Sequence, residues 1–90
     1  MKISEYNWTE IYLKAEILLS ECGVEGGIVD PDAKLLIGSK PVCHVKIPEK
    51  GNRKAIKELL TRENAKFLYG YNASGNRYKK FSITVNLEEE

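Results

Sequence analysis

The stretch FLYGYNASGNRYKKFSITV, residues 67–85, decides how the second half of this chain folds. Apolar and polar residues alternate on both sides of a centre rich in Asn, Ser and Gly, which predicts two antiparallel strands joined by a tight turn. The loop length then decides which face carries the aromatic rings, because a register shift of one residue moves every side chain to the other face of the sheet.

We favour a three-residue loop over residues 73–75, because it places a glycine at the left-handed position that such loops require. In this register Phe67 faces Phe81. The rings of Phe67, Tyr69 and Tyr71 then share a face with Phe81 and the apolar residues that follow it. Since burying three rings is favourable, this register predicts that they belong to the core.

A loop of two or four residues reverses the parity and gives a different surface. The three rings of the first strand then lie outward beside Tyr78 and Lys80, while Leu68 joins Phe81 in the core. Such a face is an aromatic and basic platform of the kind that stacks nucleic-acid bases. Tyr78 and Lys80 point outward in both registers.

A first helix is predicted over residues 8–22, with Asn7 as its N-cap and Gly23 just beyond its end. Apolar residues recur at three- and four-residue steps and form one stripe, made of Trp8, Ile11, Tyr12, Ala15, Leu18, Leu19 and Cys22. Leu13 and Ile17 fall on the other side of the helix, one turn apart. They are either a scattered surface feature or part of an oligomer interface, and we predict a dimer or partner contact there.

The remaining segments predict an α+β fold. Three short strands are expected over residues 27–30, 34–37 and 42–47. A second helix over residues 52–64 would bury Ala55, Ile56, Leu59 and Leu60. The order is therefore α-β-β-β-α-β-β, with a mainly antiparallel sheet and two helices packed on one face. Residues 1–87 should form a single compact domain, followed by an acidic tail at residues 88–90.

Composition and cysteine content limit the classes of protein to which this chain can belong. The chain has 90 residues, of which 42% are hydrophobic and 30% charged, as is usual for a globular domain. It has no apolar run of membrane-spanning length, and its first residues lack the apolar region of a signal peptide. We therefore expect a cytoplasmic protein with no membrane partner, in which Cys22 and Cys43 are reduced and buried.

Charge is distributed unevenly along the chain, although the net charge is only +1. Residues 46–80 hold ten Lys or Arg against three acids, a net charge of +7. Residues 1–45 and the last three residues each carry −3. One strongly basic third in a nearly neutral chain favours an anionic partner.

The stretch EKGNRKAIKELL, residues 49–60, adds a local signal. Arg53 and Lys54 fall in the first turn of the second helix, where the macrodipole makes cations unfavourable and where free backbone N–H groups attract anions. Long side chains that swing into water are the ordinary explanation, and an anion site is the functional one. The residues predicted to contact phosphates are Lys50, Arg53, Lys54, Lys57, Arg77, Tyr78 and Lys80.

Catalysis, metal binding and cofactor binding have little support in the sequence. Cys43 and His44 are adjacent on a strand, so their side chains point to opposite faces, and no zinc-ligand spacing or glycine-rich phosphate loop occurs. We predict a non-enzymatic binding module for nucleic acid, either RNA or DNA. The alternative is a protein-interaction module, that is, a small regulator or inhibitor of a partner protein. One version of this alternative is a module that acts as a homodimer. A third option is a small enzyme that uses Cys43 or His44.

Overall fold

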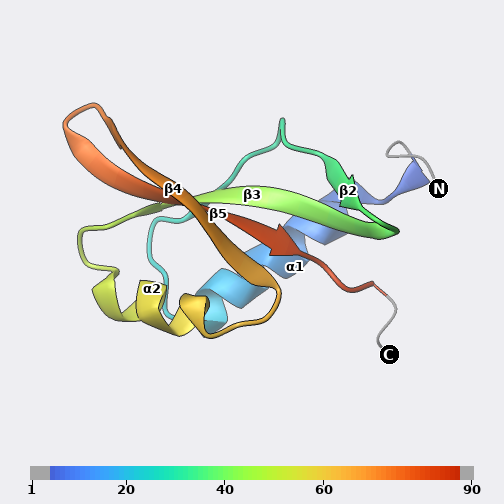
Figure 1. Ribbon diagram of the computed structural model, residues 1–90, viewed down its shortest axis with the longest axis horizontal. Helices are drawn as coiled ribbons and strands as arrows, with labels where there is room; N and C mark the ends of the chain where they lie inside the picture. Colours follow the sequence, from blue (N-terminus) through green and yellow to red (C-terminus); the bar gives the residue numbers. More distant parts are fainter. Residues whose placement is uncertain (1–4, 88–90) are drawn as a thin grey trace.

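The computed structural model describes residues 5–87 and confirms the α+β fold (Figure 1). The elements are α1 (Trp8–Glu21), β1 (Ile28–Val29), β2 (Leu35–Ile37), β3 (Lys40–Pro48), α2 (Arg53–Leu60), β4 (Ala65–Ala73) and β5 (Asn76–Thr84). Their order is the predicted one. The acidic tail predicted at residues 88–90 lies outside the described residues.

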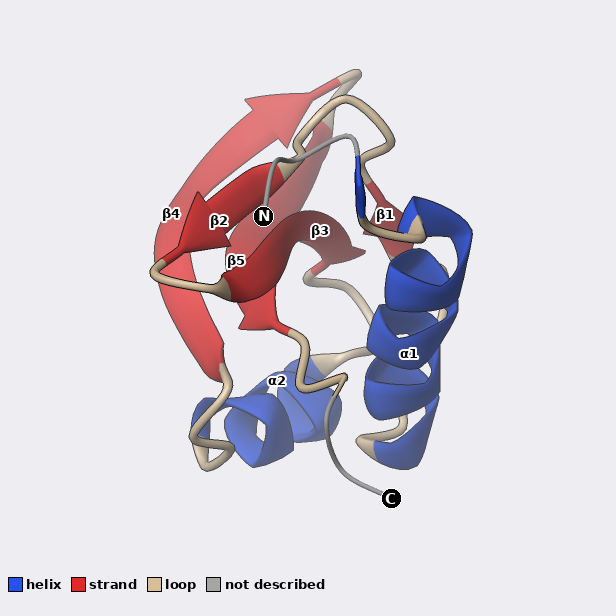
Figure 2. Cartoon of the chain, turned by 90° about the vertical axis from the view of Figure 1, so that its right-hand side faces the viewer, coloured by secondary structure: helices blue, strands red, loops and turns tan. Residues whose placement is uncertain are grey.

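All five strands form one antiparallel sheet. Its order is β1-β3-β5-β4, and β2 pairs with the first part of β3, on the same edge as β1. Both helices pack on one face of this sheet (Figure 2). The core between them is made of Trp8, Ile11, Ala15, Leu18, Leu19, Cys22, Cys43, Val45, Ile47, Ile56, Leu59, Phe81, Ile83 and Val85.

The first helix begins at Trp8 as predicted and ends one residue earlier than predicted, at Glu21, with Cys22 as its C-cap. Asn7 Oδ1 accepts a hydrogen bond from the Glu10 backbone N–H at 3.3 Å, and Gly23 follows the C-cap with a φ of 88°. The second helix is shorter than predicted, because Thr61 already caps it and the chain turns back into β4. Leu60, predicted to be buried, is the last residue of α2 and is exposed.

The loop of the β4–β5 hairpin corrects the favoured register. Ala73 pairs with Asn76, so the loop has two residues, Ser74 and Gly75, and both have positive φ values of 52° and 80°. This is the combination that a type I′ turn requires. The three-residue loop and the core position of two tyrosines were therefore wrong, as the pairing of Tyr71 with Tyr78 shows.

A β-bulge at Leu68 divides the hairpin into two registers. The pairing shifts between Phe67 and Tyr69, so Phe67 still faces Phe81, with ring centroids 5.6 Å apart. One extra residue reverses the parity of the faces, which explains why Phe67 lies on the helix side while Tyr69 points outward. Phe67 lies on an edge strand and is 41% exposed, and Leu68 does not enter the core.

Candidate functional site

The helices leave one face of the sheet uncovered, and we call it the open face (Figure 2). Residues paired directly across antiparallel strands lie on the same face. The pairing therefore sets transverse rows across β3, β5 and β4. One row holds Pro48, Tyr78 and Tyr71, the next holds Lys46, Lys80 and Tyr69, and a third holds His44, Ser82 and Lys66.

Three of these side chains form a cluster of rings on the open face. Tyr71 and Tyr78 stack with centroids 5.5 Å apart and an interplanar angle of 17°. The Tyr69 ring lies 6.0 Å from that of Tyr71 and is tilted by 60°. Tyr69 is 51% exposed, and the other two are half-buried. Tyr69 and Tyr71 lie on β4, the edge strand of the sheet, and Tyr78 lies on its neighbour β5.

Positive charge lies beside Tyr69 in this cluster. The Lys80 Nζ lies 5.8 Å from the centroid of the Tyr69 ring, and Lys46 pairs with Lys80 across the two central strands. Asp30 offsets part of this charge, since its Oδ2 lies 3.9 Å from the Lys80 Nζ. Burial, and then the charge of Lys80, lower the pKa of His44, while Asp30 acts in the opposite direction. His44 is therefore mostly neutral at pH 7.

A second feature is a surface hollow between the turn after β3 and the tip of the hairpin, which we call the hairpin hollow. Its volume is about 680 Å³, and it is lined by Pro48, Glu49, Lys50, Gly75, Asn76, Arg77 and Tyr78. The Glu49 backbone N–H donates to the Arg77 carbonyl at 3.0 Å, which fixes the two walls together. Three predicted site residues, Lys50, Arg77 and Tyr78, thus come together from segments separated in sequence.

Glu49 binds two cations on the helix side of β5. Its Oε1 lies 3.5 Å from Arg77 Nε, and its Oε2 lies 3.3 Å from Lys79 Nζ. The Lys79 Nζ also lies 5.2 Å from the centroid of the Phe67 ring. One carboxylate against two cations leaves this side of the hairpin positive. Arg77 stays largely exposed, so it can also reach a ligand.

The predicted set of cations divides between the two faces. Lys80 was grouped with Arg77, but the two residues lie on opposite faces of β5, because odd and even positions of a strand alternate. The residue that lies beside Arg77 is Lys79, which was absent from the predicted site. The same alternation would have identified it, since Lys79 is two residues from Arg77.

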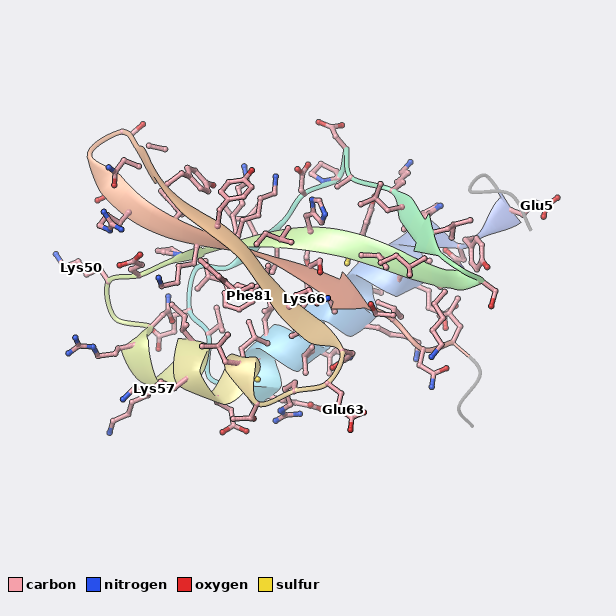
Figure 3. All side chains as sticks on the ribbon, in the orientation of Figure 1. Glu5, Lys50, Lys57, Glu63, Lys66 and Phe81 are labelled. Carbon is pink, nitrogen blue, oxygen red and sulfur yellow. The ribbon has the colours of Figure 1, made fainter. Side chains whose placement is uncertain are left out.

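The second helix presents three exposed cations, Arg53 and Lys54 in its first turn and Lys57 in its last turn. Arg53 and Lys57 line a smaller hollow of about 290 Å³ with Glu49 and Lys79, and Lys54 is not part of it. Lys50 and Lys57 both extend into solvent at the hairpin end of the molecule (Figure 3). These cations are placed to extend the positive surface beyond the hairpin hollow.

Asn52 fixes this helix start in an unexpected way. It occupies the N-cap position, but its side chain makes no capping hydrogen bond to α2. Its Oδ1 accepts from the Glu25 N–H, and its Nδ2 donates to the carbonyls of Glu25 and Pro48, each at 2.8 Å. The side chain therefore clips three segments together and leaves the first turn of α2 without a side-chain cap.

The predicted partner interface on α1 is exposed. Leu13 and Ile17 have 53% and 55% of their surface accessible, on the side of α1 away from the core stripe. Ile17 also borders a groove of about 380 Å³ whose other walls include Glu21 and Arg62. These two residues lie on a different element from the hairpin hollow.

Cys43 and His44 lie on opposite faces of β3, as predicted. Cys43 is fully buried in the core, and this burial raises the pKa of its thiol to about 11, so it is not a thiolate at neutral pH. Across residues 5–87, no group of three His, Cys, Asp or Glu side chains is placed to hold a metal ion. Over the same range, neither helix is long and apolar enough to cross a membrane.

Comparisons with protein-family models, with curated proteins and with solved structures give no match to this chain.

Proposed function

We propose that this chain is a non-enzymatic module that binds nucleic acid through the hairpin hollow and the start of α2. The observation that carries the proposal is the convergence of Lys50, Arg77 and Tyr78 around one hollow. Lys50 follows β3, whereas Arg77 and Tyr78 belong to β5, so the chain brings together two segments that are distant in sequence. Cations in such an arrangement contact phosphate oxygens, and these contacts supply affinity without reading the sequence.

The number of available cations sets the expected salt dependence. Lys50, Arg53, Lys57 and Arg77 lie around the two hollows, and Lys79 shares its charge with Glu49. About four to six phosphate contacts would give a slope of about −3 to −5 for log affinity against log salt, because each contact releases condensed counterions. A cytoplasmic location fits a protein whose thiols are unpaired and buried.

A matched pair of variants tests the proposal. Lys50→Gln with Arg53→Gln removes two cations at the site, and Lys34→Gln with Lys40→Gln removes two from the opposite half of the sequence. None of the four side chains has an ion-pair partner among the described residues, so neither change disturbs the core. The first variant should reduce the salt slope by about two units and weaken all sequences alike, and the second should not.

The readout is a fluorescence titration with random single- and double-stranded oligonucleotides at several salt concentrations. Equal effects of the two variants would contradict this location of the site. Absence of binding to either oligonucleotide at low salt would contradict nucleic-acid binding itself.

The exposed Leu13 and Ile17 support a second candidate, a protein-interaction module that forms a homodimer through α1. Two apolar side chains one turn apart give a self-complementary patch around a two-fold axis. Sedimentation of Leu13→Lys with Ile17→Lys should then show loss of the dimer, while Ile37→Lys, at an exposed apolar residue on β2, should keep it. A wild-type chain that sediments as a monomer at high concentration would remove this candidate.

A further inference from the structure

We infer that the ligand is single-stranded, and that the open face holds its unpaired bases against Tyr69. The inference rests on the proposed function and names the class of nucleic acid and the residue that stacks. It starts from the two-residue loop Ser74-Gly75, whose register places Tyr69 and Tyr71 on the open face, while the bulge at Leu68 keeps Phe67 on the helix side. The hairpin therefore carries two aromatic side chains of β4 on its solvent side.

Exposure selects Tyr69 as the main stacking residue. Tyr71 and Tyr78 stack on each other at 5.5 Å, and the Lys80 Nζ lies 5.8 Å from the centroid of the Tyr69 ring, so each of the three rings already has one neighbour. Tyr69 is tilted by 60° from Tyr71 and is 51% exposed, the largest exposed fraction among the rings of the open face. Every base has a π face, so such a ring accepts bases with little regard to sequence.

Cations of the same rows complement the phosphates of a stacked strand. Lys46 and Lys80 lie in the row of Tyr69, and Lys66, labelled in Figure 3, pairs with Ser82 in the next row. Asp30 is the acid that contacts this group, through Lys80. Three cations against one acid give the open face a positive field beside its rings, which matches an anionic strand that carries bases.

The hairpin hollow and the open face are continuous at Tyr78. This residue lines the hollow and also belongs to the row of Tyr71 on the open face. A strand whose phosphates contact Lys50 and Arg77 can therefore continue onto the rings. A duplex cannot use the rings in this way, because its bases are stacked inside the helix and present only edges and phosphates.

The test compares Tyr69→Leu, which removes the ring, with Tyr69→Phe, which keeps it. The probes are fluorescein-labelled oligo-U RNA and oligo-dT DNA of about twelve nucleotides, a duplex of equal length, and a single strand of abasic sites that keeps the phosphates. Tyr69→Leu should weaken binding of both base-bearing single strands by about 5- to 140-fold, the range expected for one stacked base. Tyr69→Phe should bind them nearly as the wild type does.

The other probes separate stacking from charge. Tyr69→Leu should leave duplex and abasic binding within about two-fold of wild type and leave the salt slope unchanged, because the phosphate contacts remain. Equal binding of the single strand by Tyr69→Leu and wild type, or an equal loss on the duplex, would overturn the inference. In that case the proposed function still stands if the Lys50 and Arg53 changes reduce the salt slope. Wild-type protein that binds none of the probes would overturn both.

Discussion

Replacing Asn52 with Ala should destabilise this protein strongly, because its side chain joins three segments at the start of α2. Asn52 is only 2% exposed, and it makes three hydrogen bonds of 2.8 Å with the backbone of Glu25 and Pro48. These bonds hold the loop after α1 and the end of β3 against the helix start. Removing the side chain leaves three backbone groups without these partners.

The expected loss follows from the number of hydrogen bonds. Each contributes a net of about 0.5–1.5 kcal/mol, so three contribute about 1.5–4.5 kcal/mol, and we expect Asn52→Ala to lower the free energy of unfolding by about 3 kcal/mol. For a domain of this size, that loss lowers the melting temperature by about 12–24 °C. Asn52→Asp has the same shape but turns a donor into an acceptor that faces two carbonyls, so it should cost at least as much.

Urea denaturation followed by circular dichroism measures these changes, with Asn72→Ala as the matched control. Asn72 is an exposed asparagine on β4, and its replacement should alter the free energy of unfolding by no more than about 0.5 kcal/mol. The reasoning is refuted if Asn52→Ala stays within about 1 kcal/mol of the wild type, or if Asn52→Asp is as stable as the wild type.

Native protein should react slowly with a thiol reagent, because burial hides Cys22 and Cys43 and raises the pKa of each thiol. Both thiols should react once urea unfolds the protein, and fast labelling of Cys43 in the native state would contradict this expectation. Folding lowers the pKa of His44 below its unfolded value of about 6.5. The contribution of His44 to the free energy of unfolding is therefore fully present above about pH 6.5 and is lost as pH falls through the folded pKa, because the folded state resists protonation of this side chain. The free energy of unfolding should therefore fall less between pH 7 and pH 5 in His44→Gln than in the wild type. An equal fall in both proteins would refute this role of His44. Gly75→Ala should lower the free energy of unfolding by about 1 kcal/mol, because φ is +80° there while a Cβ meets no neighbour; an unchanged urea midpoint would contradict the turn geometry.

Spacing in the sequence was sufficient to predict α1 and the faces of β3. The three- and four-residue steps of the apolar stripe have a direct geometric meaning on a helix, and alternation has one on a strand. Hence the burial of Ile11 and Leu18 and the opposite faces of Cys43 and His44 followed from position alone.

The hairpin shows where sequence spacing is insufficient. Counting residues from the turn assumes one register for the whole hairpin, and the bulge at Leu68 breaks that assumption because one inserted residue reverses every face beyond it. The partners of Asn52 were also beyond prediction, since they depend on how the loop containing Glu25 meets the end of β3. Both features depend on tertiary packing, which no local pattern encodes.

The most direct measurement of nucleic-acid binding is a titration of wild-type protein with single-stranded oligonucleotide between about 50 and 200 mM salt. Convergence of Lys50, Arg77 and Tyr78 around the hairpin hollow predicts binding at the lowest salt and a slope of about −3 to −5 for log affinity against log salt. Absence of binding at low salt, or an affinity that does not change with salt, would contradict a role for these residues in holding a nucleic-acid strand.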